Sequence, residues 1–233
     1  MSSPAIQVRS ARAALSRRRM SAEERKRQIL RSAIESFAQK GFSGTKTRDI
    51  AAAAGVSEAI LFRHFATKED LYHAILDIKE TREGTSQRMQ ELEALAARRD
   101  DAALLSELAQ QTLRSFKNDP AFHRLLLYAG LEGHLLASLF HERFGLPTGD
   151  FLRKYITLRQ EEGAFWRCDP DTAVMFFFGS VVQYAMSRYL FGAESELPPD
   201  EPVAAELVGL VLRGLANPGH KRIARKAVNA TKV

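Results

Sequence analysis

The segment from Lys46 to Phe65, KTRDIAAAAGVSEAILFRHF, combines the spacing of a helix-turn-helix with side chains that can contact nucleic acid. The small Ala51 lets two helices approach, Gly55 permits the positive φ of a tight turn, and Leu61 anchors the second helix. Many helical hairpins satisfy these three positions alone. With capped helices on both sides, the segment predicts a reader of double-stranded DNA.

Four helices within residues 21 to 80 are expected to position this segment. Ser21 with Glu24, and Thr67 with Asp70, have the spacing of capping boxes, which predicts a helix start at each place. The two outer helices would therefore begin close to residues 21 and 67.

Two shorter helices are expected between these boxes. Thr47 is predicted to cap a helix that ends near Ala54, and Ser57 to cap one that runs through His64. Capping is thus an alternative to a binding role for both residues. For His64, the alternative is packing beside Phe65.

The positive charge of the chain is concentrated near its N-terminus. Residues 1 to 72 hold 14 Lys or Arg and 7 Asp or Glu, a net of +7, whereas the whole chain carries a net of +6. A basic head on a near-neutral body indicates a polyanionic partner for the head, although such a run can also be a solvated face or a disordered arm.

The composition argues against several classes of protein. The apolar share of 45% suits a soluble globular chain, and the longest nearly uncharged run, 173 to 187, is too short for a membrane helix. No secretory signal is evident, so a cytoplasmic protein without membrane contact is expected. Cys168, the single cysteine, is interpreted as a partly buried apolar residue, and the six histidines form no metal-binding motif. No cofactor or metal is expected.

The chain beyond residue 80 is expected to be helical, and nothing predicts a strand. Residues 83 to 100 either continue the fourth helix or connect it to the rest. The segment 170 to 191 is apolar around almost its whole circumference, so it must be buried on more than one side, by the chain's own helices or by a second copy. The predicted helices are 102 to 116, 120 to 131, 149 to 162, 170 to 191 and 202 to 215.

Residues 21 to 80 resemble the TetR family of bacterial one-component regulators. The remainder is similar to the family only in being helical. The resemblance implies an all-α fold with an N-terminal three-helix helix-turn-helix DNA-binding domain and a larger helical ligand-binding and dimerisation domain. The matching residues are Ile29, Ala33, Phe37, Gly41, Phe42, Thr47, Asp49, Ile50, Ala51, Ala54, Gly55, Val56, Ser57, Leu61, His64, Phe65, Lys68, Leu71 and Tyr72.

This resemblance implies four regions. Residues 1–20 would be a flexible basic arm, and residues 21–80 the DNA-binding domain, with its helix-turn-helix at 46–65. Residues 81–217 would form the helical effector-binding and dimerisation domain, and residues 218–233 a basic tail.

The resemblance also implies a set of DNA-binding residues. Thr47 and Arg48 would hold a phosphate at a helix N-terminus. The residues from 57 to 60 would face base edges in the major groove, and those near the end of that helix and just beyond it would hold the DNA backbone. The full set is Thr47, Arg48, Ser57, Glu58, Ala59, Ile60, Phe62, Arg63, His64 and Lys68.

Two positions depart from the family pattern. Glu58 stands where Lys or a small polar residue is frequent, and phosphate repels its carboxylate unless the group accepts a hydrogen bond from cytosine N4 or pairs with an arginine. Phe62 stands where a Tyr hydroxyl often reaches a phosphate. The arginines of the arm could compensate by entering the minor groove.

The resemblance implies a repressor that binds DNA as a homodimer and releases the DNA when a small-molecule effector binds. Segments 170 to 191 and 202 to 215 would form the dimer, placing two recognition helices about 34 to 36 Å apart on a near-palindromic operator. The effector would lower DNA affinity by favouring another conformer. The candidate effector residues, each of which has an ordinary core or surface role as its alternative, are His123, Tyr128, His134, Trp166, Phe177, Tyr184 and Arg188.

Two other functions remain open at this stage. One is a regulator or activator of the same fold without an effector. The other is an enzyme that uses Cys168 or the scattered histidines, although no nucleophile, base and orienting residue form a recognisable arrangement.

Overall fold

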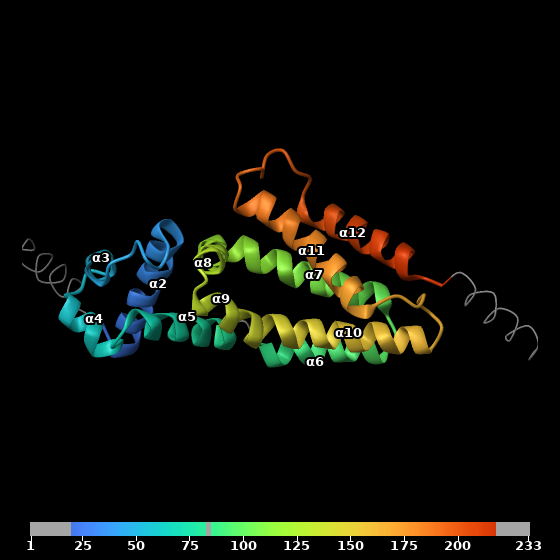
Figure 1. The fold of residues 1–233 in the computed structure, drawn as a ribbon, viewed down its shortest axis with the longest axis horizontal. Helices are drawn as coiled ribbons and strands as arrows, with labels where there is room; N and C mark the ends of the chain where they lie inside the picture. The colour runs from blue at the N-terminus through green and yellow to red at the C-terminus, as the bar shows by residue number, and fades with distance from the viewer. Residues whose placement is uncertain (1–19, 83–84, 218–233) are drawn as a thin grey trace, which may run out of the picture. The chain divides into compact units, whose positions relative to one another are not determined.

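The computed structural model describes residues 20–82 and 85–217, so the predicted tail and nearly all of the predicted arm lie outside the described residues. Every named element in the described part of the chain is helical (Figure 1). Its one β-type pairing is an isolated bridge between Phe165 and Ala216. The expected all-α fold is therefore confirmed.

The chain divides into two compact units, one up to Ile75 and the other from Leu76 onward. The first unit holds α2 (Ala22–Lys40), α3 (Thr47–Ala53), α4 (Glu58–His64) and most of α5 (Lys68–Arg82). Helix α2 packs on α3, and α3 packs on α4. The four helices expected between residues 21 and 80 are all present.

Both predicted capping boxes form. The backbone N–H of Ser21 donates to the Glu24 carboxylate at 2.7 Å, and that of Glu24 donates to Ser21 Oγ at 3.1 Å. Thr67 and Asp70 make the same reciprocal pair, at 2.9 and 3.1 Å. These bonds satisfy N–H groups that lack a partner inside the helix, which fixes where α2 and α5 begin.

The cap predicted at Thr47 is wrong. Helix α3 begins at Thr47 itself, and its N-cap residue, Lys46, makes no side-chain cap bond. The Thr47 hydroxyl instead donates to Glu58 Oε1 at 2.5 Å. The cap predicted at Ser57 is confirmed, because Ser57 Oγ accepts from the N–H of Ile60 at 3.3 Å.

A small apolar core holds the first unit together. Phe37, Ile50 and Leu61, from three successive helices, are fully buried. Phe37 also meets Tyr72 of α5 edge to face, with ring centroids 4.9 Å apart. Gly55, in the turn between α3 and α4, has φ +62°, which a side chain would strain. The apolar and glycine positions of the motif therefore have the roles that their spacing predicts.

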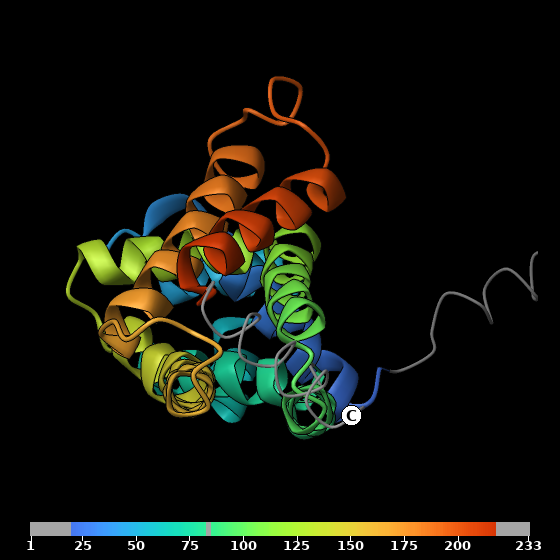
Figure 2. The same ribbon diagram turned by 90° about the vertical axis from the view of Figure 1, so that its right-hand side faces the viewer.

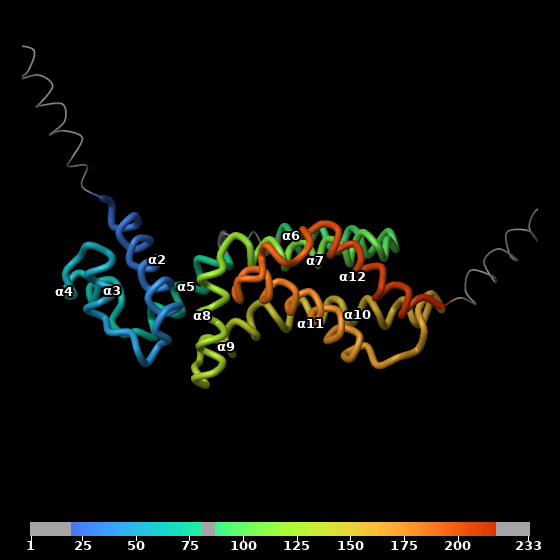
Figure 3. The backbone as a smooth tube through the Cα atoms, turned by 90° about the horizontal axis from the view of Figure 1, so that it is seen from above, coloured from blue at the N-terminus to red at the C-terminus, as the bar shows by residue number. Residues whose placement is uncertain are grey.

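The second unit is built around α7. It contains α6 (Thr85–Ala97), α7 (Asp101–Asn118), α8 (Pro120–Leu131), α9 (Leu135–Phe140), the π-helix η1 (His141–Gly145), α10 (Leu146–Glu161), α11 (Pro170–Tyr189) and α12 (Asp200–Leu215). Helix α7 contacts α6, α8, α11 and α12. Figure 2 shows α11 and α12 side by side against α7, and Figure 3 shows α10 running along α11.

The second unit departs from expectation at its start and between α8 and α10. Residues 85–97 form α6, and the π-helix η1 follows α9 in a stretch for which no helix was expected. The five predicted helices are present, with ends that differ by up to three residues. A π-helical turn is rare, and it often occurs beside a functional site.

Helix α11 is buried on one side only within the chain. Phe177, Val181 and Ala185, spaced four residues apart, are fully buried against the rest of the unit. Met175 and Phe176 are 69% and 63% exposed. Cover for this second side by another copy of the chain stays a prediction.

Two further features concern the whole described part of the chain. None of its helices combines the length and apolar character that crossing a membrane requires. No three of its His, Cys, Asp or Glu side chains gather as a metal site.

Cys168 is exposed, and its carbonyl accepts a hydrogen bond from the Gln160 amide at 2.9 Å, so the partly buried position expected for it is wrong.

Candidate DNA-binding surface and internal cavity

Helix α4 presents one exposed face. Glu58, Ala59, Phe62 and Arg63 are exposed at successive turns, whereas Leu61 is fully buried beneath them. Ile60 and His64 are intermediate. The exposed face has the helical spacing that a recognition helix needs to reach base edges.

The N-termini of α3 and α4 are joined by the bond between Thr47 and Glu58. Glu58 is exposed, and its carboxylate accepts the Thr47 hydroxyl hydrogen at 2.5 Å. Its partner is thus a hydroxyl and not an arginine. Arg48 remains 68% exposed, with only a 3.7 Å contact to Asp49. A guanidinium and a carboxylate therefore stand near the same end of the surface.

Lys68 supports the loop that leads into α3. Its ammonium donates to the carbonyls of Phe42 and Thr45, at 2.8 and 3.0 Å, and lies 4.0 Å from the centre of the Phe42 ring. Thr45 is buried and donates its hydroxyl hydrogen to the Gly41 carbonyl at 2.7 Å. These bonds leave Lys68 one hydrogen for another partner. Thr45 positions the loop, and no sequence signal distinguished it.

The structure thus places the predicted DNA-binding residues together in the first unit. Thr47 and Arg48 begin α3, Ser57 caps α4, and the other α4 positions follow along that helix. Lys68 begins α5. Whether they contact DNA stays a prediction.

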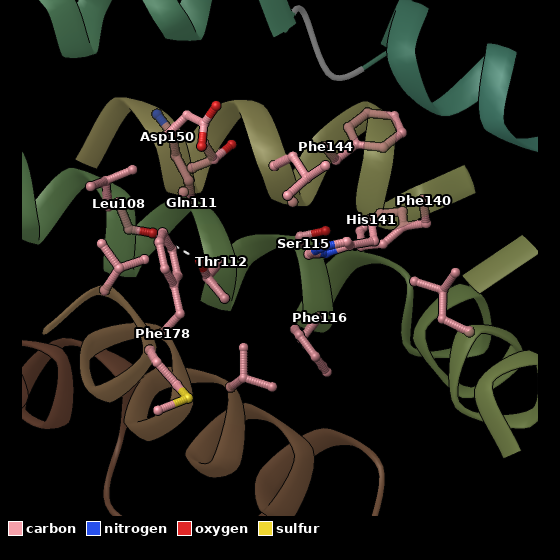
Figure 4. A pocket seen from close by; sticks show the side chains of 18 of the residues that line it. Leu108, Gln111, Thr112, Ser115, Phe116, Phe140, His141, Phe144, Asp150 and Phe178 are labelled. Carbon is pink, nitrogen blue, oxygen red and sulfur yellow. Dashed lines mark hydrogen bonds between the residues drawn. The ribbon is translucent and has the colours of Figure 1, made fainter. Parts of the chain in front are cut away.

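The second unit contains a cavity of about 720 Å³ (Figure 4). Residues of α6, α7, α8, α9, η1, α10 and α11 line it. Its lining is mostly apolar, with four phenylalanines: Phe116, Phe140, Phe144 and Phe178. Its volume falls within the usual range of small-molecule sites.

His123 is the one predicted effector residue that lines this cavity. Its ring stacks on Phe116, with centroids 3.7 Å apart and planes 9° from parallel, and its Nε2 lies 3.0 Å from Ser115 Oγ. Burial disfavours the charged ring, and the nearby Lys79 ammonium adds to this, so that the pKa of His123 falls to about 4. The ring is neutral at neutral pH.

The other six predicted effector residues lie outside the lining. Tyr128 and Trp166 are 36% and 52% exposed, His134 is the N-cap residue of α9, and Phe177 is in the core. Tyr184 donates to the Pro198 carbonyl at 2.6 Å, and Arg188 donates to the same oxygen at 3.0 Å. These last two residues therefore hold the segment that precedes α12.

Sequence reasoning missed the polar residues that do line the cavity. Gln111, Thr112 and Ser115 lie on one face of α7 and line the cavity. Arg153 also lines it; this guanidinium pairs with Asp150 and, through its Nε at 2.9 Å, with Asp171. The spacing of the three α7 residues was a usable signal, since it places them on one helix face.

The sequence comparisons with known proteins match the first unit and not the second. The family described as "Bacterial regulatory proteins, tetR family" matches residues 29–75. The transcriptional repressor Rv3405c of Mycobacterium tuberculosis is 44% identical over 68 residues, which are 28% of this chain and 36% of that protein. The regulator RutR of Escherichia coli is 46% identical over 52 residues, 22% of this chain and 24% of its own length. The chain thus matches only about a quarter to a third of each relative.

The fold comparison extends over both units. A solved structure of AibR, in complex with isovaleryl coenzyme A and operator DNA, covers 80% of this chain and 97% of its own, with a TM-score of 0.60 and 22% identity. Helices α2 to α5 and the helical unit that follows define a helix-turn-helix protein with a larger second domain. Residues 29–75 of this chain match the TetR family of bacterial regulatory proteins, and the helical fold of both units is similar to that of the AibR structure.

Proposed function

We propose that this protein is a cytoplasmic transcriptional repressor that binds a near-palindromic operator as a homodimer and is released by a small molecule. It acts by binding and not by catalysis. The observation that carries the proposal is the exposed face of α4, in a unit whose residues 29–75 match the family. Rv3405c is named a repressor, which supports the direction of regulation.

The proposed DNA contacts follow from the geometry of α3 and α4. The exposed Arg48 and the N-terminus of α3 suit a phosphate, and Arg63 suits the backbone further along the groove. Glu58, Ala59 and their neighbours at the start of α4 would face the bases. The α3 N-terminus can bind a phosphate through Thr47's backbone N–H while its hydroxyl stays with Glu58.

The proposed dimer interface is the outer side of α11 and α12. Phe176 of α11 and Leu210 of α12 are 63% and 50% exposed, and the two helices contact each other. A twofold-related copy would cover both and form a four-helix interface. The resulting spacing of about 34 to 36 Å between recognition helices would match one turn of DNA.

The proposed release rests on the cavity. A molecule bound there lowers DNA affinity only if it binds the non-DNA-bound conformer more tightly. The cavity supports an effector over an effector-less regulator of this fold, because a mostly apolar cavity of about 720 Å³ has the size and lining of small-molecule sites.

The decisive experiment is selection of bound duplexes from a random DNA pool with the purified full chain. A recovered site with twofold symmetry is the expected result. Recovery of an asymmetric site would contradict the homodimer, and failure to enrich any sequence would contradict specific DNA binding. Expression of a reporter behind the recovered site should rise when the gene is deleted, and a fall would show activation instead.

Replacing Glu58 by Gln should raise affinity for random-sequence duplex DNA by about threefold to tenfold, because a carboxylate near phosphates is removed. Gln keeps an oxygen that can accept from Thr47. Fluorescence anisotropy with labelled duplex at several salt concentrations measures the change. The exposed Glu35, on α2, provides the matched Glu35→Gln control. Equal effects of the two substitutions would contradict a position of Glu58 at the DNA.

Phe176→Asp should raise the dissociation constant of the dimer by about tenfold or more, since it places a charge in an apolar interface. Leu131→Asp is the control, because Leu131 is 87% exposed on α8, outside the proposed interface. Sedimentation equilibrium measures both variants. A Phe176→Asp protein that dimerises like the unmodified chain would contradict this interface.

A further inference from the structure

The charged groups that line the cavity balance one another. Arg88 and Arg153 carry positive charge, whereas Asp150 and Asp171 carry negative charge. Arg153 contacts both carboxylates, which leaves that end without an uncompensated cation. A ligand anion at that end would therefore meet two carboxylates beside a single guanidinium.

His123 adds no positive charge to the wall of the cavity that it forms. The ring is buried against Phe116 and held by Ser115, and its lowered pKa keeps it neutral. Lys79 is committed to Asp119 through a 2.6 Å bond and does not line the cavity. An anionic group placed against His123 would lose hydration without gaining a counter-charge from this ring or from Lys79.

The polar stripe of α7 offers mainly hydrogen-bond acceptors. The Thr112 hydroxyl donates its hydrogen to the Leu108 carbonyl at 2.9 Å, which leaves its oxygen lone pairs for another partner. The Gln111 amide nitrogen donates one of its two hydrogens to Glu107 Oε1 at 3.0 Å, which leaves its carbonyl oxygen and one N–H. A polar group bound at this stripe is best matched if it donates a hydrogen.

The remaining lining suits flat aromatic rings. Figure 4 shows Phe140 and Phe144 toward one end of the cavity, and Gln111 and Asp150 toward the other. Phe140 and Phe144 stack with centroids 5.1 Å apart. Aromatic ligands gain contact energy in offset or edge arrangements with such rings.

We propose that the cavity binds an uncharged, mainly aromatic molecule that carries a hydrogen-bond donor, and that it discriminates against organic anions of the same shape. The aromatic walls hold the rings, and the acceptors of α7 take the donated hydrogen. The role of this molecule as an effector rests on the proposed function. The binding of this molecule to the cavity does not depend on the proposed function.

Two fluorescent probes test the charge preference directly. N-phenyl-1-naphthylamine is neutral and has an N–H donor, and 8-anilinonaphthalene-1-sulfonate has the same skeleton with an added sulfonate. Titration of the full chain should give a dissociation constant at least about tenfold lower for the neutral probe, because burying the sulfonate costs its hydration. Equal or tighter binding of the sulfonate, or no binding of the neutral probe, overturns the proposal.

A matched pair of threonine variants places the neutral probe in this cavity. Thr112→Val removes one of the acceptors that line the cavity and should weaken probe binding by about threefold to tenfold. Thr157→Val removes the same kind of hydroxyl, which donates to the Arg153 carbonyl at 2.9 Å but does not line the cavity. Equal effects of the two substitutions overturn the placement, and thermal melting confirms that both variants fold.

A separate DNA assay distinguishes this proposal from the proposed function. Binding of the neutral probe to a chain that selects no DNA would retain the ligand class and overturn the regulator. If the chain selects DNA but prefers the sulfonate probe, the proposed regulator would be retained and the proposed ligand class would be overturned. If both proposals hold and the neutral probe favours the released conformer, a saturating concentration of the probe should weaken binding of the chain to the selected duplex. The size of this change measures the coupling between the cavity and the DNA-binding surface.

Discussion

Lys79→Met should lower the free energy of unfolding by about 2 to 4 kcal/mol, because it removes one partner of a largely buried ion pair. Lys79 is 9% exposed, and its ammonium lies 2.6 Å from Asp119 Oδ2 and 4.3 Å from the centre of the Phe122 ring. Methionine replaces much of the aliphatic stem but leaves the Asp119 charge without its cation. Urea unfolding followed by circular dichroism measures the loss.

A second role of Asp119 makes this pair sensitive. Its other oxygen accepts from the N–H of Phe122 at 3.0 Å, so the same carboxylate caps α8 and holds the end of α5. Combining Lys79→Met with Asp119→Asn should recover part of the loss, because Asn also caps helices and carries no charge. The double variant therefore separates an unpaired charge from lost packing.

The control for Lys79 is a more exposed ion pair in the same unit. Arg143 lies 2.7 Å from Asp77, and the two side chains are 32% and 65% exposed. Arg143→Met should cost less than about 1 kcal/mol, since solvent screens such a pair. Similar losses for Lys79→Met and Arg143→Met would contradict the importance of burial at Lys79.

The local signals of the first unit could be predicted from the sequence because their partners are close in the chain. Ser21 and Glu24 are three residues apart, and so are Thr67 and Asp70, so the helix itself brings each pair together. The cap expected at Thr47 failed for the opposite reason. Its partner, Glu58, is eleven residues away across the turn.

The cavity could not be predicted in the same way. Candidates chosen by residue type included Tyr184 and Arg188, which turn toward the segment before α12, whereas Val182 and Met186 of the same helix line the cavity. Helix α11 is apolar around most of its circumference, so its pattern does not indicate which face meets which neighbour. That choice depends on tertiary packing.

The π-helix η1 illustrates a further limit. Residues 141–145 contain charged, aromatic and glycine positions without a clear helical period, and no element was expected there. In the structure, this segment supplies Phe144 and His141 to the cavity lining. The sequence therefore indicated that the second unit is helical, but not which irregular segment would complete its cavity.

His123 should make the stability of the second unit fall as the pH decreases from about 6.5 to about 4. The pKa of its ring is lowered from 6.5 to about 4 in the folded chain, first by burial and then by the Lys79 ammonium, with Asp119 opposing the shift. Between these values the unfolded chain binds a proton that the folded chain does not. Its contribution is thus present above pH 6.5 and is lost as the pH falls to about 4.

A His123→Phe variant isolates this effect, because it keeps an aromatic ring against Phe116 and removes the titrating group. The unmodified chain should lose up to about 3 kcal/mol more than the variant between pH 7 and pH 4, the value that a shift of this size implies. Urea unfolding at several pH values gives the difference, in which the carboxylates common to both proteins cancel. Parallel pH profiles would mean that the ring titrates equally in the folded and unfolded chains, which would contradict its burial as a neutral group.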